Sequence, residues 1–141
     1  MADYYTHFSF EIPKLHKAEK EWVEAEIKKR EQEEDQDGFS RFDAEWAFED
    51  GGLWIHDGSG QANLDYAVLL VQDFIKQFRP TAIFAFEWSN NCSRPRLDAY
   101  GGGAVVITAR KVHWMNTSTW MRNRIEKIEK SRAVDAKRKK R

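Results

Sequence analysis

Hydrophobic and polar residues alternate in two early stretches of the chain. Residues 4–12 place phenylalanine and isoleucine at even positions from residue 8 onwards, and residues 42–49 alternate between aromatic or small residues and mostly acidic ones. A period of two is typical of strands with one buried face. The Asp-Gly-Gly sequence at 50–52 predicts a hairpin that returns through a short strand at 53–56.

Apolar side chains spaced three to four residues apart predict two helices. Residues 14–36 are rich in Glu, Lys and Ala, with an apolar stripe that includes Leu15 and Trp22. We expect the Glu-rich end of this helix to fray. The helix after Asn63 is the clearest element, because its apolar residues fit one face, Asn63 is a suitable N-cap and Pro80 ends it.

The C-terminal half begins with a strand. Residues 81–88 are apolar on both faces, as expected of a central strand. A long loop is predicted at 89–103, followed by a strand at 104–109 that continues irregularly to Trp114. Asn116 offers a cap for a last helix, on which three apolar residues share a face: Met121, Ile125 and Ile128.

These elements follow the order β-α-β-β-α-β, with an added strand and a C-terminal helix. The order predicts an α+β fold with a ferredoxin-like antiparallel sheet, covered on one face by two helices. The added strand is expected to pair beside residues 81–88. We assign residues 1–130 to one domain and residues 131–141 to a flexible basic tail.

Charge is balanced over the whole chain but unevenly distributed along it. The 141 residues carry 23 Lys and Arg against 23 Asp and Glu. Residues 31–50 hold nine acids and one base, whereas residues 122–141 hold ten bases and three acids. The chain is therefore polarised along its sequence, which bears on its partners rather than on its fold.

The cysteine count and the hydropathy pattern indicate the cellular compartment in which the protein is expected. Cys92 is the only cysteine, so no intramolecular disulfide can form, which fits a reducing environment. The first ten residues lack the pattern of a secretory signal. No apolar stretch approaches the roughly 20 residues of a membrane span. These features predict a cytoplasmic protein that does not associate with membranes.

The predicted loop and the residues beside it form the first candidate site. Arg94 and Arg96 could bind a phosphate or carboxylate, with the glycine amides of 101–103 as an anion nest. That would make the chain a small enzyme or a binding domain for a nucleotide-like anion. The alternative is a connection whose arginines pair with the acidic strands. The candidate ligand-binding residues are Glu87, Asn90, Arg94, Arg96, Tyr100 and His56.

Carboxylates on strands form a second candidate. Glu45, Glu49 and Glu87 could converge with His56 or His7 for acid–base chemistry or cation binding. The favoured interpretation is that these side chains are simply the polar residues of the solvated face of an antiparallel sheet. The histidines lack metal-ligand spacing, no nucleophile motif surrounds Cys92, and no catalytic triad can be assembled. We therefore predict no metal and no cofactor, and favour a protein without enzymatic activity.

Tryptophan and the C-terminal bases suggest interaction surfaces. Trp46 and Trp88 are expected to face the helices, whereas Trp54 has the opposite parity and is expected on the open side of the sheet with Glu45 and Glu49. Acids there would repel a nucleic-acid backbone, which favours a protein partner. The basic end could bind nucleic acid without reading its sequence, or could only aid solubility: Lys137, Arg138, Lys139, Lys140 and Arg141.

The stretch from Phe84 to Ala109, including Glu87-Trp-Ser-Asn-Asn-Cys-Ser-Arg-Pro-Arg and Gly101-Gly-Gly, resembles a group of small uncharacterised proteins of bacteria and their phages or plasmids. The later Trp114-Met-Asn-Thr adds to this resemblance, which covers roughly residues 4–121. It implies a mobile-element context and no particular mechanism.

The leading hypothesis is a small protein-interaction module, and one form of it is a phage or mobile-element accessory that modulates a host protein. It would present the acidic, aromatic sheet face and the 89–103 loop to that partner.

Overall fold

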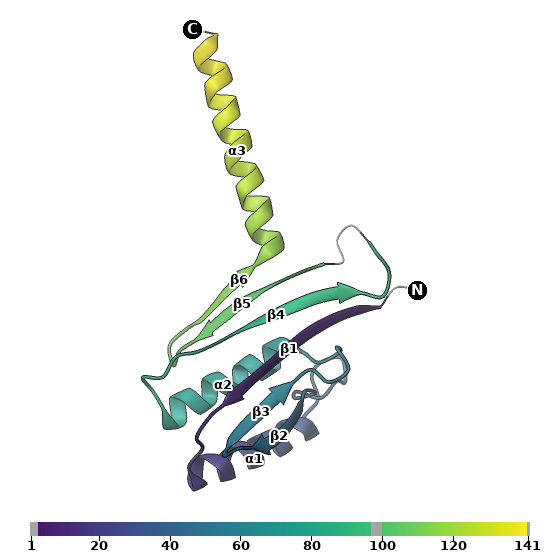
Figure 1. The fold of residues 1–141 in the computed structure, drawn as a ribbon, viewed down its shortest axis with the longest axis vertical. Helices are drawn as coiled ribbons and strands as arrows, with labels where there is room; N and C mark the ends of the chain where they lie inside the picture. The colour runs from purple at the N-terminus through teal and green to yellow at the C-terminus, as the bar shows by residue number, and fades with distance from the viewer. Residues whose placement is uncertain (1–2, 97–99, 141) are drawn as a thin grey trace.

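The computed structural model describes residues 3–96 and 100–140 (Figure 1). Within these residues, nine helices and strands follow one another. They are β1 (Tyr4–Ile12), α1 (Lys17–Gln32), β2 (Glu45–Glu49), β3 (Gly52–His56), α2 (Leu64–Phe78), β4 (Phe84–Cys92), β5 (Gly101–Ile107), β6 (Val112–Asn116) and α3 (Thr117–Lys139).

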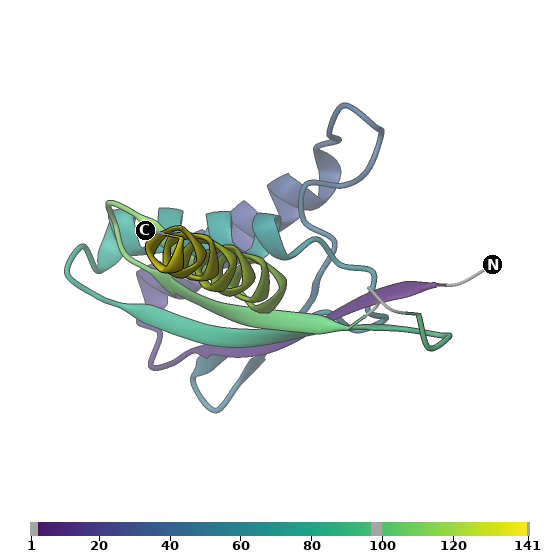
Figure 2. The same ribbon diagram turned by 90° about the horizontal axis from the view of Figure 1, so that it is seen from above.

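All six strands form one antiparallel sheet in the order β2-β3-β1-β4-β5-β6. Helices α1 and α2 lie on the same side of this sheet (Figure 2). The predicted α+β class and antiparallel sheet are therefore confirmed, as is the pairing of the added strand beside β4. We call the side of the sheet that α1 and α2 leave uncovered the open face.

The core lies between the sheet and α1 and α2. Alternation along the strands sends Phe8, Ile12 and Val105 to the helices, and α2 contributes the fully buried Phe74. Phe10 of β1 stacks on Phe86 of β4, with ring centroids 4.3 Å apart. As predicted, Trp46 and Trp88 lie on this side and are half-buried against the core.

A buried ion pair joins α1 to the end of α2. Glu19 is buried, and its carboxylate accepts hydrogen bonds from Arg79 Nε at 2.9 Å and Nη2 at 3.2 Å. Arg79 also donates to the carbonyl oxygens of Pro13 and Lys14. Burial would raise the pKa of Glu19, but Arg79 and the backbone N–H of His16 outweigh it and hold that pKa below its ordinary value.

Several predicted boundaries are wrong. The first helix is shorter than 14–36, and β2 starts only at Glu45. Strand β4 continues through Cys92, because Ser89, Asn90 and Asn91 pair with β1 and β5. The connection predicted at 89–103 is therefore reduced to 93–100, since its glycines also belong to β5.

The predicted irregular extension to Trp114 is a separate strand. A turn that returns the chain from β5 to β6 is closed by Thr108 N–H donating to the Lys111 carbonyl at 3.0 Å. The Thr108 hydroxyl reinforces the turn through two contacts with Lys111. Strand β6 becomes an edge of the sheet.

Helix α3 leaves the sheet directly from β6 and projects away from the rest of the molecule (Figure 1). The Asn116 side chain caps it, as predicted, by accepting from the N–H groups of Ser118 and Thr119. None of the side chains of α3 is buried. Residues 131–139, expected as a tail, are helical and form its last turns. In the part of the chain that the structure describes, no helix combines the length and apolarity needed to cross a membrane.

Candidate functional site

The open face carries all the ionised side chains of the strands. The six strands contain four glutamates and no Lys or Arg. Strand pairing places each glutamate on the open face and all four are exposed: Glu11, Glu45, Glu49 and Glu87. Because the strands contribute no Lys or Arg to offset these glutamates, this face presents negative charge to solvent.

One row of paired residues crosses the sheet. It begins with Glu45, which lies opposite His56, and His56 lies opposite Ser9 of the central strand β1. On the other half of the sheet, Glu87 lies opposite Ala104, which lies opposite Met115 at the edge. Glu45 and Glu87, which were predicted to converge on one site, therefore share a face but not a contact, because β3 and β1 separate their strands.

Trp54 lies on the open face, as its parity predicted, but it is only partly exposed. Its indole Nε1 donates to Ser9 Oγ at 2.7 Å, and its ring stacks on His56 with centroids 4.0 Å apart. His56 Nε2 in turn lies 3.7 Å from Glu45 Oε2. The aromatic part of the face is thus held rigid by its neighbours, which lowers the entropy cost of binding at this point.

A hollow of about 420 Å³ lies on the same face beside β1. His7, Asp57 and Glu87 are among the residues that line it. His7 Nδ1 is 3.1 Å from Asp57 Oδ2, and His7 Nε2 is 3.2 Å from Asn91 Oδ1. Both ring nitrogens are engaged, so His7 has no free position from which to act as a base on a neighbouring serine.

Asp57 is a residue beside the open face that the sequence did not single out. It follows β3, and its Oδ1 accepts from Phe8 N–H at 2.9 Å. Burial would raise the pKa of Asp57, but that bond and His7 hold the pKa below its ordinary value. No local pattern signals a contact across 50 residues of chain, so only the fold reveals it.

The residues predicted to bind an anion are dispersed. Asn90 points to the helix side of β4, where its Oδ1 accepts from Thr6 Oγ1 at 3.0 Å. Arg94, Arg96 and Tyr100 are exposed beyond the end of β4, and no ion pair joins either arginine to a carboxylate among the described residues. Glu87 lies five residues before the end of that strand, roughly 16 Å away along it.

The glycine run has a structural reason. Gly101, Gly102 and Gly103 pair with Asn90, Ser89 and Trp88 in the sheet, so they do not form the predicted anion nest. A Cβ at Gly103 would overlap the Met115 carbonyl oxygen and the Trp88 indole ring. Glycine here allows Trp88 to pack between the strands and Trp114, whose ring centroid is 5.5 Å from that of Trp88.

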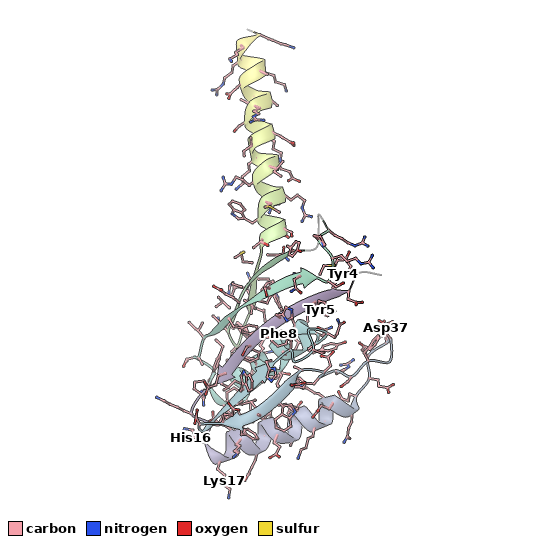
Figure 3. All side chains as sticks on the ribbon, turned by 45° about the vertical axis from the view of Figure 1, so that its right-hand side comes forward. Tyr4, Tyr5, Phe8, His16, Lys17 and Asp37 are labelled. Atoms are coloured by element: carbon pink, nitrogen blue, oxygen red, sulfur yellow. The ribbon has the colours of Figure 1, made fainter. Side chains whose placement is uncertain are left out.

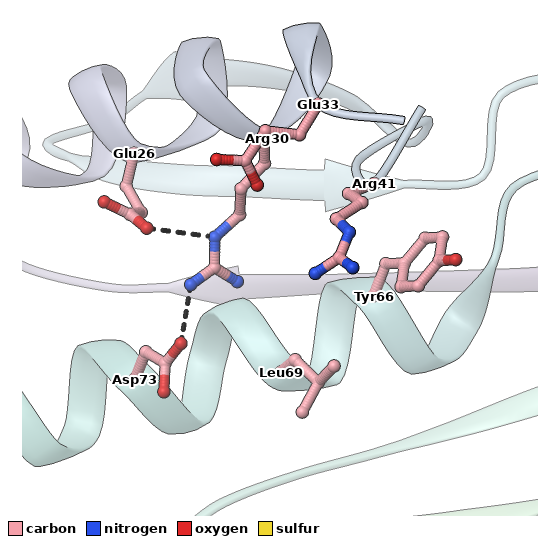
Figure 4. Close-up of a pocket in the computed structure, with 7 residues that line it drawn as sticks. All are labelled: Glu26, Arg30, Glu33, Arg41, Tyr66, Leu69 and Asp73. Carbon is pink, nitrogen blue, oxygen red and sulfur yellow. Dashed lines mark hydrogen bonds and ion pairs between the residues drawn. The ribbon is translucent and has the colours of Figure 1, made fainter. Parts of the chain in front are cut away.

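A second hollow, of about 210 Å³, lies between α1 and α2 (Figure 4). Arg30 bridges Glu26 of its own helix and Asp73 of α2. Three acids and two arginines line the hollow, so its charge does not favour an anion: Glu26, Glu33, Asp73, Arg30 and Arg41. The network joins the two helices and is best explained by their packing. Among the described residues, no cluster of His, Cys, Asp and Glu fits a metal ion.

The nucleic-acid candidates occupy the far end of α3. Lys137, Arg138 and Lys139 form its last turn, Lys140 follows as the C-cap, and Arg141 lies outside the described residues. Figure 3 shows side chains extending from α3 on every side, without another element beside them. Comparison of the chain with protein-family models, curated proteins and solved structures found no match.

Proposed function

We propose that the chain is a cytoplasmic protein-interaction module whose open face binds a basic segment of a protein partner. One observation carries the proposal: none of the helices in the described part of the chain covers this face, and every ionised side chain of its strands is a carboxylate. Complementary charge steers association and selects partners. The ordered Trp54–His56 stack supplies an aromatic contact of the kind enriched where proteins bind one another.

The same proposal includes a ferredoxin-like core made of the first four strands. Two connections support it. Helix α1 connects β1 to β2, which β3 separates in the sheet, and α2 connects β3 to β4, which β1 separates. Such split crossovers place both helices on one face and leave the other free. Strands β5 and β6 then widen the free face.

A titration tests the proposed function. We expect a synthetic amphipathic helix of Lys and Leu to bind the chain, and replacement of three open-face glutamates by glutamine to weaken binding by at least about tenfold. Those replacements are E45Q, E49Q and E87Q. A matched triple variant on the opposite side controls for the loss of charge: E21Q, E31Q and E34Q, all exposed in or just after α1.

Isothermal titration calorimetry gives both affinities. Equal weakening in the two triple variants would show attraction to net charge alone and would contradict the proposal. Absence of binding both to the unaltered chain and to the α3 variant R124E/R132E would contradict it as well.

A further inference from the structure

Helix α3 exposes apolar side chains that a stable helix normally covers. Trp120, Met121, Ile125 and Ile128 are 57%, 55%, 54% and 44% exposed. An apolar groove of about 560 Å³ opens where α3 leaves β6, lined by Met115, Thr117, Trp120 and Met121. In proteins, most helical stability comes from packing of the apolar face against another surface. A surface that covers α3 is therefore expected.

The helix combines this apolar stripe with positive charge. Met121, Ile125 and Ile128 follow one another at spacings of four and three residues, which places them on one side. Arg124 and Arg132 lie close to that stripe on the helix surface. Residues 117–140 contain nine Lys and Arg against three acids.

The open face has the matching pattern. Next to Glu87 lie small apolar residues of β4 and β5, namely Ala85, Ala104 and Val106. Met115 continues this surface to the root of α3. The apolar stripe of α3 and its nearby arginines can therefore lie on these apolar residues and on the glutamates of the neighbouring strands.

We propose that two copies of the chain exchange their α3 helices, each lying across the open face of the other. This inference rests on the proposed function, because it names the partner of the same face. A two-fold axis between the helices makes the two contacts identical and closes the assembly as a dimer.

The helix cannot cover its own sheet. Strand β6 ends at Asn116 and α3 begins at Thr117, so no linker allows the helix to turn back. The Asn116 cap fixes the start of the helix, which points away from the sheet (Figure 1). A second copy supplies the face that the first cannot reach.

The length of α3 is sufficient to cross the width of the sheet. A helix of 23 residues is about 35 Å long. Six strands at their usual spacing extend about 24 Å from the first to the last. One α3 is therefore long enough to cross every strand of the partner's open face and to bring its basic residues over glutamates on both halves of the sheet.

Charge reversal provides the test, with sedimentation equilibrium of the full chain as the measurement. We expect the unaltered chain to be a dimer at about 100 µM. The face-reversed variant E45K/E87K and the helix-reversed variant R124E/R132E should each raise the dimer dissociation constant at least about tenfold. Mixed in equal amounts, these two variants should form a heterodimer, because the lysines introduced in one face then meet the glutamates introduced in the partner's helix, while the unaltered face meets the unaltered helix.

The matched control is E21K/E31K on α1, which should dimerise like the unaltered chain. Circular dichroism confirms that each variant is folded. A monomeric unaltered chain at about 100 µM would overturn the inference. So would a dimer that survives E45K/E87K but is lost in I125N, because that result indicates pairing between two α3 helices instead.

The helix-reversed variant separates this inference from the proposed function. If its open face is unoccupied, it should bind the Lys/Leu helix with an affinity that depends on Glu45 and Glu87. Binding of that peptide with no self-association of the unaltered chain would support the function and overturn the exchange. Salt-sensitive binding of α3 to duplex DNA by a monomeric unaltered chain would also overturn the exchange.

Discussion

Helices α2 and α3 each carry an apolar stripe, yet only α2 is buried. Six residues of α2 are buried, and only three of its 15 residues are charged. Helix α3 buries none of its 23 residues and carries 11 charged ones in Thr117–Lys139. The comparison shows that periodicity identifies which side of a helix is apolar, but not which surface covers that side or whether that surface belongs to the same chain.

The largest expected effect comes from truncating the core face of α2. Phe74 is fully buried, with its ring centroid 5.5 Å from that of Phe78 and 6.2 Å from that of Trp22. Phe74→Ala should lower the free energy of unfolding by about 4 kcal/mol, because it removes apolar burial and leaves a cavity. Urea denaturation measures the change.

Ile125→Ala on α3 is the matched control. Measured in the monomeric R124E/R132E background, it should change the free energy of unfolding by less than about 0.5 kcal/mol, as expected of an exposed position. A loss similar to that of Phe74→Ala would show that α3 packs on its own chain and would remove the contrast between the two helices.

The next effect concerns the sheet from which α3 projects. Gly103→Ala should lower the free energy of unfolding by about 3 kcal/mol, since the added methyl group overlaps the Met115 backbone and the Trp88 ring. Val106→Ala is a control on the same strand, because its side chain is exposed on the open face. Thermal unfolding should separate the two variants, and equal stabilities would contradict the close packing at Gly103.

A smaller and pH-dependent effect is expected where α2 ends. Glu19→Gln should cost about 2 kcal/mol at neutral pH, because Arg79 loses its ion pair in a partly buried position. The pKa of Glu19 is lowered by folding, so its contribution is present above the ordinary value of 4.5 and is lost as pH falls through the lowered value. The difference between variant and unaltered chain should therefore shrink as pH falls below 4.5 and through the lowered pKa of Glu19. A difference independent of pH would contradict this assignment.

Local patterns predicted the elements whose signals lie within a few residues. Both asparagine caps are of this kind, since Asn63 and Asn116 accept from N–H groups two and three residues later. The alternation that placed Trp54 and Glu45 on one face is equally local. These features depend on backbone geometry, which nearby residues largely decide.

What could not be predicted depends on distant residues. The polar end of β4 reads as a loop, but pairing between Tyr4 and Cys92 and between Asn90 and Gly101 makes it a strand. The turn before β6 contains no glycine and is closed by Thr108 instead. The contact between His7 and Asp57 and the separation of Arg94 from Glu87 are likewise set by the sheet, which no local pattern shows.

The most direct test of the central claim is to locate the bound Lys/Leu helix by amide chemical-shift changes in the R124E/R132E chain. The acidic open face predicts shifts concentrated at Glu45, His56, Glu87 and Ala104, with little change in α1 and α2. Shifts confined to α1 and α2, or the same map after E45Q/E49Q/E87Q, would contradict that claim.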